Sequence, residues 1–188
     1  NQFRWDNVAY DRSSKVFSAD SFSFKPSLSK EAFAASRPFQ TDYIQLESGR
    51  IEAGPFDINT YLNDTVIQAG SVRIGQLKLD DYRDNRYPFE AGVRKPLWAE
   101  LVTKIPVRLS VDSIIVTNSE VRYEEINPRQ NESVAIPVNR MQVTVSPVKN
   151  FDLKPTDSLS IHASAYILDT IGINLHIKQS YTDSLQGF

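Results

Sequence analysis

The sequence has 188 residues, and its 21 lysines and arginines nearly balance its 23 aspartates and glutamates, which leaves a net charge of −2. That balance excludes the strongly basic surface of a typical nucleic-acid-binding protein. The absence of cysteine excludes disulfides, thiolate metal sites and cysteine nucleophiles.

The N-terminal part of the chain predicts two strands and a short helix. Aromatic and alternating residues over 3–10 and 16–25 favour strands on either side of a polar turn. Ser29 is placed to cap a helix over 29–36, because a serine side chain can accept a hydrogen bond from the first helical turn. Pro38 marks the end of this segment.

An alternating pattern appears twice in the sequence. Residues 41–51 and 111–121 each place alternating apolar residues before a small polar break, with an offset of 70 from Leu46 to Val116. We therefore expect one β-rich domain over 1–188, with pseudo-repeat units at about 16–80 and 106–149. A protein of this kind usually works through an extended surface.

The second half of each unit is again extended. Over 66–80 the apolar phase slips by one near Gly75, which predicts a bulge or bend there. A helical turn is possible over 56–62, and residues 81–95 indicate a surface loop. A second helix is expected over 96–105, with an apolar stripe that is able to cover the sheet. The stripe consists of Leu97, Trp98, Leu101, Val102 and Ile105.

The C-terminal region, 158–180, predicts a hairpin with one apolar and one polar face. With a three-residue turn, opposite positions sum to 338, so Ala163 faces Leu175 and His162 faces His176. The apolar face is a candidate groove. Its residues are Leu159, Ile161, Ala163, Ala165, Ile167, Ile171, Ile173, Leu175 and Ile177.

Two groups of polar residues are candidates for binding a metal ion or an anion. The His162–His176 pair lacks a third metal ligand, so we expect two solvated side chains and no metal. Arg83, Asp84 and Arg86 form a candidate polar surface cluster, in which the nearby acidic residues disfavour an anion.

A catalytic centre is not expected in this sequence. Glu124 and Glu125 are adjacent on a predicted strand and so point to opposite faces, which disfavours a carboxylate dyad. The sequence shows neither a nucleophile elbow nor a phosphate-binding glycine loop. We therefore expect no catalytic residue and no cofactor. The fold class is mainly β, as a curved antiparallel sheet or a sandwich of two related β-units with two short helices.

Four segments together resemble the AsmA-like family of cell-envelope proteins. They are 22–33 (FSFKPSLSKEAF), 40–46 (QTDYIQL), 77–88 (LKLDDYRDNRYP) and 105–114 (IPVRLSVDSI), the last running on to Val121–Glu125. The resemblance implies a repeating β-sheet with an apolar concave groove that carries lipid. It also implies a location in the periplasm or cell envelope, with a membrane anchor outside this sequence. It supplies no catalytic residues.

Three functions follow as expectations. The first is a non-enzymatic periplasmic section of an AsmA-like protein, involved in lipid handling or outer-membrane maintenance, with lipid or other envelope proteins as partners. The second is an interaction or adhesion module that recruits other chains at exposed strand edges. The third is a glycan-binding sandwich that uses Trp5, Tyr82 and Tyr87.

Overall fold

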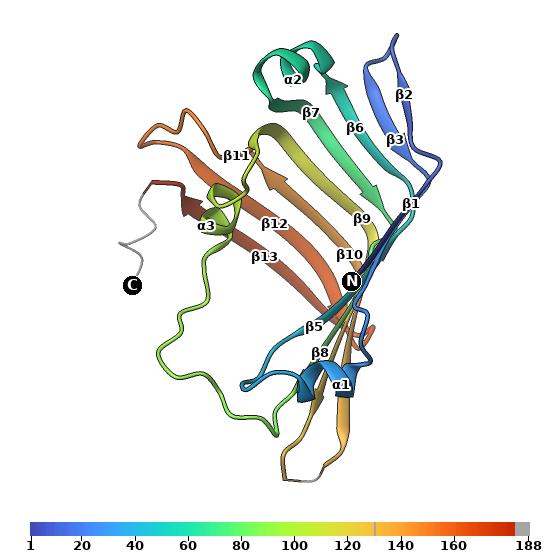
Figure 1. Ribbon diagram of the computed structural model, residues 1–188, viewed down its shortest axis with the longest axis vertical. Coiled ribbons are helices and arrows are strands. Elements are labelled where there is room, and N and C mark those ends of the chain that lie inside the picture. The colour runs from blue at the N-terminus through green and yellow to red at the C-terminus, as the bar shows by residue number, and fades with distance from the viewer. Residues whose placement is uncertain (130, 183–188) are drawn as a thin grey trace.

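A computed structural model describes residues 1–129 and 131–182, and within these residues it contains one 13-stranded sheet and three short helices. The sheet is strongly bent (Figure 1). The elements in chain order are β1 (Gln2–Asp6), β2 (Ala9–Asp11), β3 (Val16–Ala19), β4 (Ser21–Lys25), α1 (Lys30–Ala35), β5 (Tyr43–Ser48), β6 (Ile51–Phe56), α2 (Ile58–Asp64), β7 (Val66–Gly75), β8 (Lys78–Asp84), α3 (Trp98–Thr103), β9 (Arg108–Ile126), β10 (Ser133–Ser146), β11 (Val148–Lys149), β12 (Ser158–Ile167) and β13 (Ile171–Ser180).

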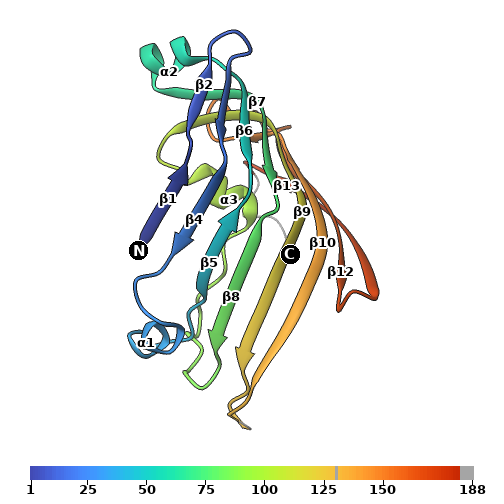
Figure 2. The ribbon, with the colours of Figure 1, turned by 90° about the vertical axis from the view of Figure 1, so that its right-hand side faces the viewer.

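Most of the short strands come in consecutive pairs, such as β3 and β4 or β5 and β6, that are separated by only one or two residues and together span the sheet. The lower arm of the sheet contains β1, β4, β5 and β8, which pair side by side in that order, and the upper arm contains β2, β3, β6 and β7. The long strand β9 joins the arms, because its first half pairs with β7 and its second half with β8. On its other side it pairs with β10, as Figure 2 shows, and with the short strand β11.

The sheet is mixed, whereas the sequence led us to expect a purely antiparallel one. β9 runs parallel to both β7 and β8. The connection over 85–107 returns the chain to the end of the sheet where β7 began, and such a crossover makes the next strand parallel. The two alternating segments 41–51 and 111–121 consequently run in opposite directions across the sheet.

A line of backbone irregularities separates the two arms. We call it the crease, and it passes through Asn7, Asp20, Gly49, Gln76, Asn118 and Arg140. Gln76, Asn118 and Arg140 have positive φ angles of 53°, 50° and 53°. The slip predicted near Gly75 is confirmed, since β7 ends there and β8 starts at Lys78.

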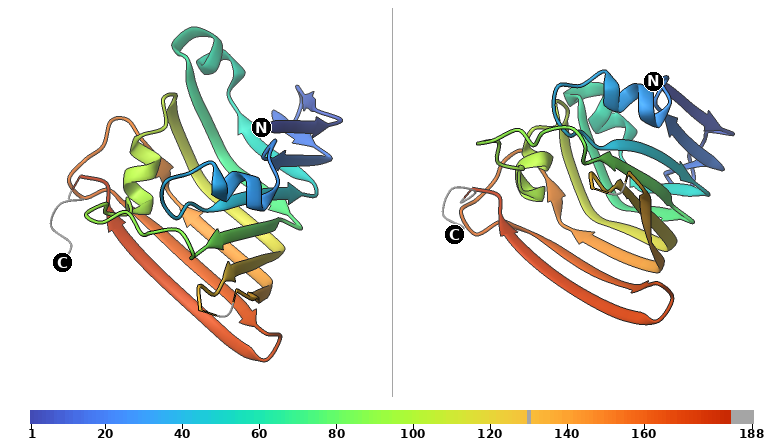
Figure 3. Two further views of the ribbon diagram at one scale, coloured as in Figure 1. Left: turned by 60° about the horizontal axis from the view of Figure 1, so that its bottom comes forward. Right: turned by 90° about the horizontal axis from the view of Figure 1, so that it is seen from below.

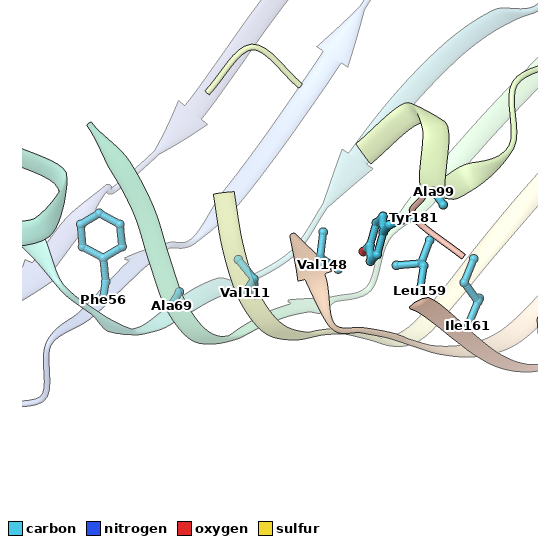
Figure 4. Packing of buried hydrophobic residues seen from close by; sticks show 8 residues of the cluster. All are labelled: Phe56, Ala69, Ala99, Val111, Val148, Leu159, Ile161 and Tyr181. Atoms are coloured by element: carbon cyan, nitrogen blue, oxygen red, sulfur yellow. The ribbon is translucent and has the colours of Figure 1, made fainter. Parts of the chain in front are cut away.

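The largest core cluster lies on the concave side of the bend. Phe56, Ala69, Val111, Val148, Leu159 and Ile161 project from the sheet towards the same side (Figure 4). Tyr181 closes one end, where its hydroxyl donates to the carbonyl of Pro147 at 2.6 Å. Figure 3 shows the sheet curving around the side on which α3 lies.

Helix α3 is fixed to this core by a small residue. Ala99 is 1% exposed, and its backbone N–H donates to Gln179 Oε1 on β13 at 3.0 Å. The predicted stripe is only partly right: Val102 packs against the core, but Trp98 and Leu101 are exposed. A helix that approaches the sheet through an alanine turns its larger neighbours away from the contact.

Helix α1 covers the lower arm on its convex face, opposite the side on which α3 lies. As predicted, Ser29 is its N-cap and accepts a hydrogen bond from the N–H of Ala32. Its Ala34 packs with Tyr43 and Tyr82 in a second core cluster. Tyr43 and Leu46 lie three residues apart in a regular ladder and therefore point to opposite faces.

The remaining local predictions are mostly confirmed. The β12–β13 register pairs Ala163 with Leu175 and His162 with His176, as expected. The turn suggested at 56–62 is a full helix, α2, so the described residues hold three helices instead of two. The loop expected from residue 81 begins later, because β8 continues to Asp84. A single sheet replaces the sandwich alternative.

Candidate functional site

Directly paired residues share a face of the sheet, so the ladders can be followed across it. From the β12–β13 groove face, three rows of apolar side chains extend across the sheet. The row below the crease is Phe3, Phe24, Leu46, Leu79, Val121, Val138, Ile167 and Ile171. The row above it is Ala19, Ile51, Ile74, Val116, Val143, Ala163 and Leu175. The next is Tyr10, Phe17, Ala53, Val72, Ile114, Val145, Ile161 and Ile177.

The crease keeps these rows on one side of the bent sheet. The two rows that flank it are five residues apart in each interrupted strand, for example Ile74 to Leu79 and Val116 to Val121. Residues five apart in a regular strand point to opposite faces. One extra residue at the crease, such as Gln76 or Asn118, restores the common face.

Part of this concave face lacks a protein cover. Leu175 on β13 is 50% exposed, and Trp5 and Val8 at the other edge are 53% and 61% exposed. A pocket of about 500 Å³ lies at that edge. Its lining residues are Trp5, Val8, Phe17, Ser18, Ala19, Ile51, Ala53 and Val72. Its size and apolar lining are those of a small-ligand site.

The lower arm ends in a polar lip on the same concave face. Arg83 forms an ion pair with Asp42, and Tyr123 donates a hydrogen bond to Glu125 at 2.9 Å. Asp81, two residues from Leu79, has a buried Oδ1 that accepts no hydrogen bond within the described part of the chain. Burial raises the pKa of the Asp81 carboxyl, and the negative charge of Asp42 raises it further.

The predicted groove residues divide into a covered and an uncovered part. Leu159, Ile161 and Ala165 are buried, whereas Ile171 and Leu175 on the edge strand are exposed. The other strands also contribute apolar residues to this face, which the alternation within the hairpin does not predict. The five-residue step between apolar positions, repeated in several strands, was the signal for them.

The histidine pair lies on the convex face, opposite the groove. The rings of His162 and His176 are stacked, with centroids 4.0 Å apart and planes 18° from parallel. Ring nitrogen lone pairs lie in the ring planes, so those of stacked rings do not converge on one ion. No group of three or more potential ligands occurs in residues 1–129 and 131–182.

The structure separates the predicted polar cluster. Arg83 faces the groove lip with Asp42, whereas Arg86 pairs with the buried Asp84 at 2.7 Å. The hydrogen bonds from Arg86 outweigh burial and lower the pKa of the Asp84 carboxyl. Asp–Arg pairs thus stabilise this end of β8, which leaves no shared anion site.

Two further candidates are placed in structural roles. Glu124 binds Lys30 of α1 at 2.7 Å, while Glu125 accepts from Tyr123, so the two glutamates point apart as expected. Tyr82 is 3% exposed beneath α1. Because a glycan needs an accessible ring to stack on, Tyr82 is not available for the stacking role that the glycan-binding alternative gave it beside Trp5 and Tyr87.

No protein-family model matches the chain, and neither does any curated protein sequence. Among the helices in the described ranges, none has the length and apolar character needed to cross a bilayer.

Proposed function

We propose that this chain is a non-enzymatic section of an AsmA-like envelope protein and that its concave face handles lipid in the periplasm. The four resembling segments support the family proposal, and the geometry supports the ligand class independently. An acyl chain is long, flexible and apolar, so it matches a continuous apolar face better than a closed pocket.

The observation that carries the proposal is the set of three apolar rows that run along the crease from strand to strand on the concave face. An acyl chain lying along the crease would contact strand after strand, and each buried methylene contributes about 0.8 kcal/mol. The partly exposed Arg83–Asp42 pair of the polar lip gives the headgroup of such an amphiphile a polar environment beside the groove.

Trp5 provides a direct test because it lines the pocket at the groove edge. In a Trp98→Phe variant, Trp5 is the remaining tryptophan, and a brominated fatty acid in the groove should quench its fluorescence. Across a series of saturated fatty acids, each added methylene should tighten binding about fourfold, as expected from the methylene free energy. Absent quenching, or an affinity independent of chain length, would contradict the proposal.

A matched pair of charge variants sharpens this test. Val8→Asp places a carboxylate in the pocket at an exposed position and should weaken fatty-acid binding by about tenfold or more. Leu28→Asp adds the same charge at an exposed position between β4 and α1, outside the three rows and the pocket, and should leave binding unchanged. Equal effects of the two variants would indicate non-specific charge repulsion.

One observation favours the second candidate, an interaction module. Within the described residues, the ten-residue strand β13 pairs only with β12, so no second strand occupies its other edge. Such edges recruit further strands. Capture of a specific protein partner that is lost on introducing Asn174→Pro, with no fatty-acid binding by the parent protein, would favour this candidate over lipid handling.

A further inference from the structure

The connection over 85–107 presents an apolar stripe to solvent. On α3 and just beyond it, Trp98, Leu101 and Ile105 are 57%, 43% and 39% exposed. Their i, i+3, i+7 spacing places them on one side of the helix, beside the face that packs on the sheet. Earlier in the same connection, Phe89 and Val93 are also exposed.

Basic residues border this stripe, although the whole chain is slightly acidic. Residues 85–107 contain four basic residues against two acidic ones, Glu90 and Glu100. Glu100 is neutralised by Arg94 at 2.6 Å. Lys95 is largely exposed, with only a distant contact of 3.9 Å to Asp42, and Lys104 forms no ion pair within the described part of the chain.

We propose that this connection docks the protein on an anionic lipid bilayer. Trp98, Leu101 and Ile105 enter the interfacial layer, while Lys95 and Lys104 lie near the lipid phosphates. Tryptophan favours the boundary between headgroups and acyl chains, and basic residues beside an apolar stripe add attraction to anionic lipid.

The position of the stripe gives this contact a defined orientation. The connection lies on the side to which the bent sheet opens, as Figures 1 and 3 show. Docking therefore turns the concave side of the protein towards the bilayer. The proposal does not depend on the groove holding lipid, since the stripe and its charges belong to a separate surface.

The two tryptophans allow the contact to be observed directly. In a Trp5→Phe variant, Trp98 reports alone; with vesicles of phosphatidylglycerol and phosphatidylcholine its emission should shift to shorter wavelength, and brominated lipid should quench it. Vesicles of phosphatidylcholine alone should bind more weakly. Lys95→Gln and Lys104→Gln should each reduce sedimentation with anionic vesicles about fivefold.

A matched leucine pair tests the apolar part of the contact. Leu101→Ala should reduce vesicle binding about tenfold. Leu62→Ala, at a 71% exposed position on α2, should not change it. Both positions are exposed, so thermal unfolding should confirm that each variant folds. Absence of vesicle binding, unchanged Trp98 emission, equal effects of the two leucine variants, or capture of a protein by the stripe without lipid binding would overturn the proposal.

The two lipid proposals fail in different ways. Leu101→Ala should leave fatty-acid binding in solution unchanged, whereas Val8→Asp should weaken it without abolishing vesicle docking. If the parent protein binds fatty acid in solution but does not bind anionic vesicles, the groove proposal stands and the docking proposal is rejected.

Discussion

Two serines beside the crease differ in their hydrogen bonds, although both are buried. Ser119 Oγ accepts from the N–H of Leu77 at 2.9 Å and donates to the carbonyl of Thr117 at 2.9 Å. Ser48 Oγ has no hydrogen-bond partner within the described residues. The first hydroxyl thus joins β9 to the interruption between β7 and β8, while the second only fills space.

This difference predicts that the same substitution, serine to alanine, costs much more stability at Ser119 than at Ser48. Ser119→Ala leaves the Leu77 N–H without its acceptor and should lower the free energy of unfolding by about 1–3 kcal/mol. Ser48→Ala removes an unsatisfied polar atom and should change it by no more than about 0.5 kcal/mol. Urea denaturation of both variants measures the contrast, and equal losses would reject it.

Glu124 gives the protein a predictable response to acid. Burial acts to raise its pKa, but hydrogen bonds from Lys30, Ser133 and Arg122 outweigh burial and lower the pKa to about 2. A carboxyl with a lowered folded-state pKa stabilises the protein above its unfolded-state value, about 4.5. This stabilisation should decline as the pH falls from about 4.5 to about 2.

The variant Glu124→Gln isolates this contribution. It should lose about 1–2 kcal/mol of stability at neutral pH, because Lys30 is left without its carboxylate. It should also lose less stability than the parent protein between pH 4.5 and pH 2. Glu47→Gln, which breaks the exposed pair with Lys25, is the control and should cost under about 0.5 kcal/mol. Parallel acid-denaturation curves for parent and Glu124→Gln would contradict the assignment.

At the scale of elements, β6 and the start of β3 meet through a glycine. A Cβ on Gly54 would lie 2.8 Å from Val16 Cγ2 and 2.9 Å from the carbonyl oxygen of Lys15. Gly75, at the end of β7, has its nearest such neighbour at 3.7 Å, an ordinary contact. The close approach at Gly54 seats the β2–β3 hairpin against β6.

Alanine at each glycine should therefore have a different effect. Gly54→Ala must displace backbone and should cost about 1–3 kcal/mol. Gly75→Ala should be close to neutral or stabilising by up to about 1 kcal/mol, because it restricts the unfolded chain. Chemical denaturation again gives the measurement, and a stable Gly54→Ala protein would show that the hairpin moves freely.

At the scale of the whole molecule, the two arms depend on the same strand. β9 forms ladders with β7 in the upper arm and with β8 in the lower arm. Unfolding of either arm therefore removes hydrogen bonds from β9, the strand on which the other arm also depends. We expect one cooperative transition. Fluorescence of Trp5 alone, Trp98 alone and far-ultraviolet circular dichroism should give the same urea midpoint after correction for the effect of each substitution. Separate midpoints would indicate that the edge strand β1 and the region around α3 unfold independently.

The C-terminal hairpin could be predicted to its register, because a short turn and period-two alternation fix it locally. The cap of α1 at Ser29 is equally local. The crease was predicted only near Gly75, where the apolar phase changes within one uninterrupted run. Between β5 and β6 (Ser48–Ile51) and within β10 (Val138–Val143), the five-residue step between apolar positions spans polar residues. The sequence pattern does not show the step there, and the pairing with neighbouring strands does.

Non-local contacts account for the incorrect predictions. Tyr82 has the pattern of an accessible strand residue, but α1, about fifty residues earlier in the chain, covers it. The outward turn of Trp98 depends on Ala99 meeting β13 through Gln179. The parallel β7–β9 pairing depends on the path of a long connection, which sequence periodicity does not specify.

The interrupted strands all bend at the crease, so the concave face has nearly the same cross-section from one strand to the next. Neighbouring strands lie about 4.8 Å apart, so each additional hairpin with the same five-residue step would lengthen it by about 10 Å. Its capacity would then scale with the number of hairpins, while the shape of each segment stayed the same. Length could thus change by duplication or deletion without redesign of the lining.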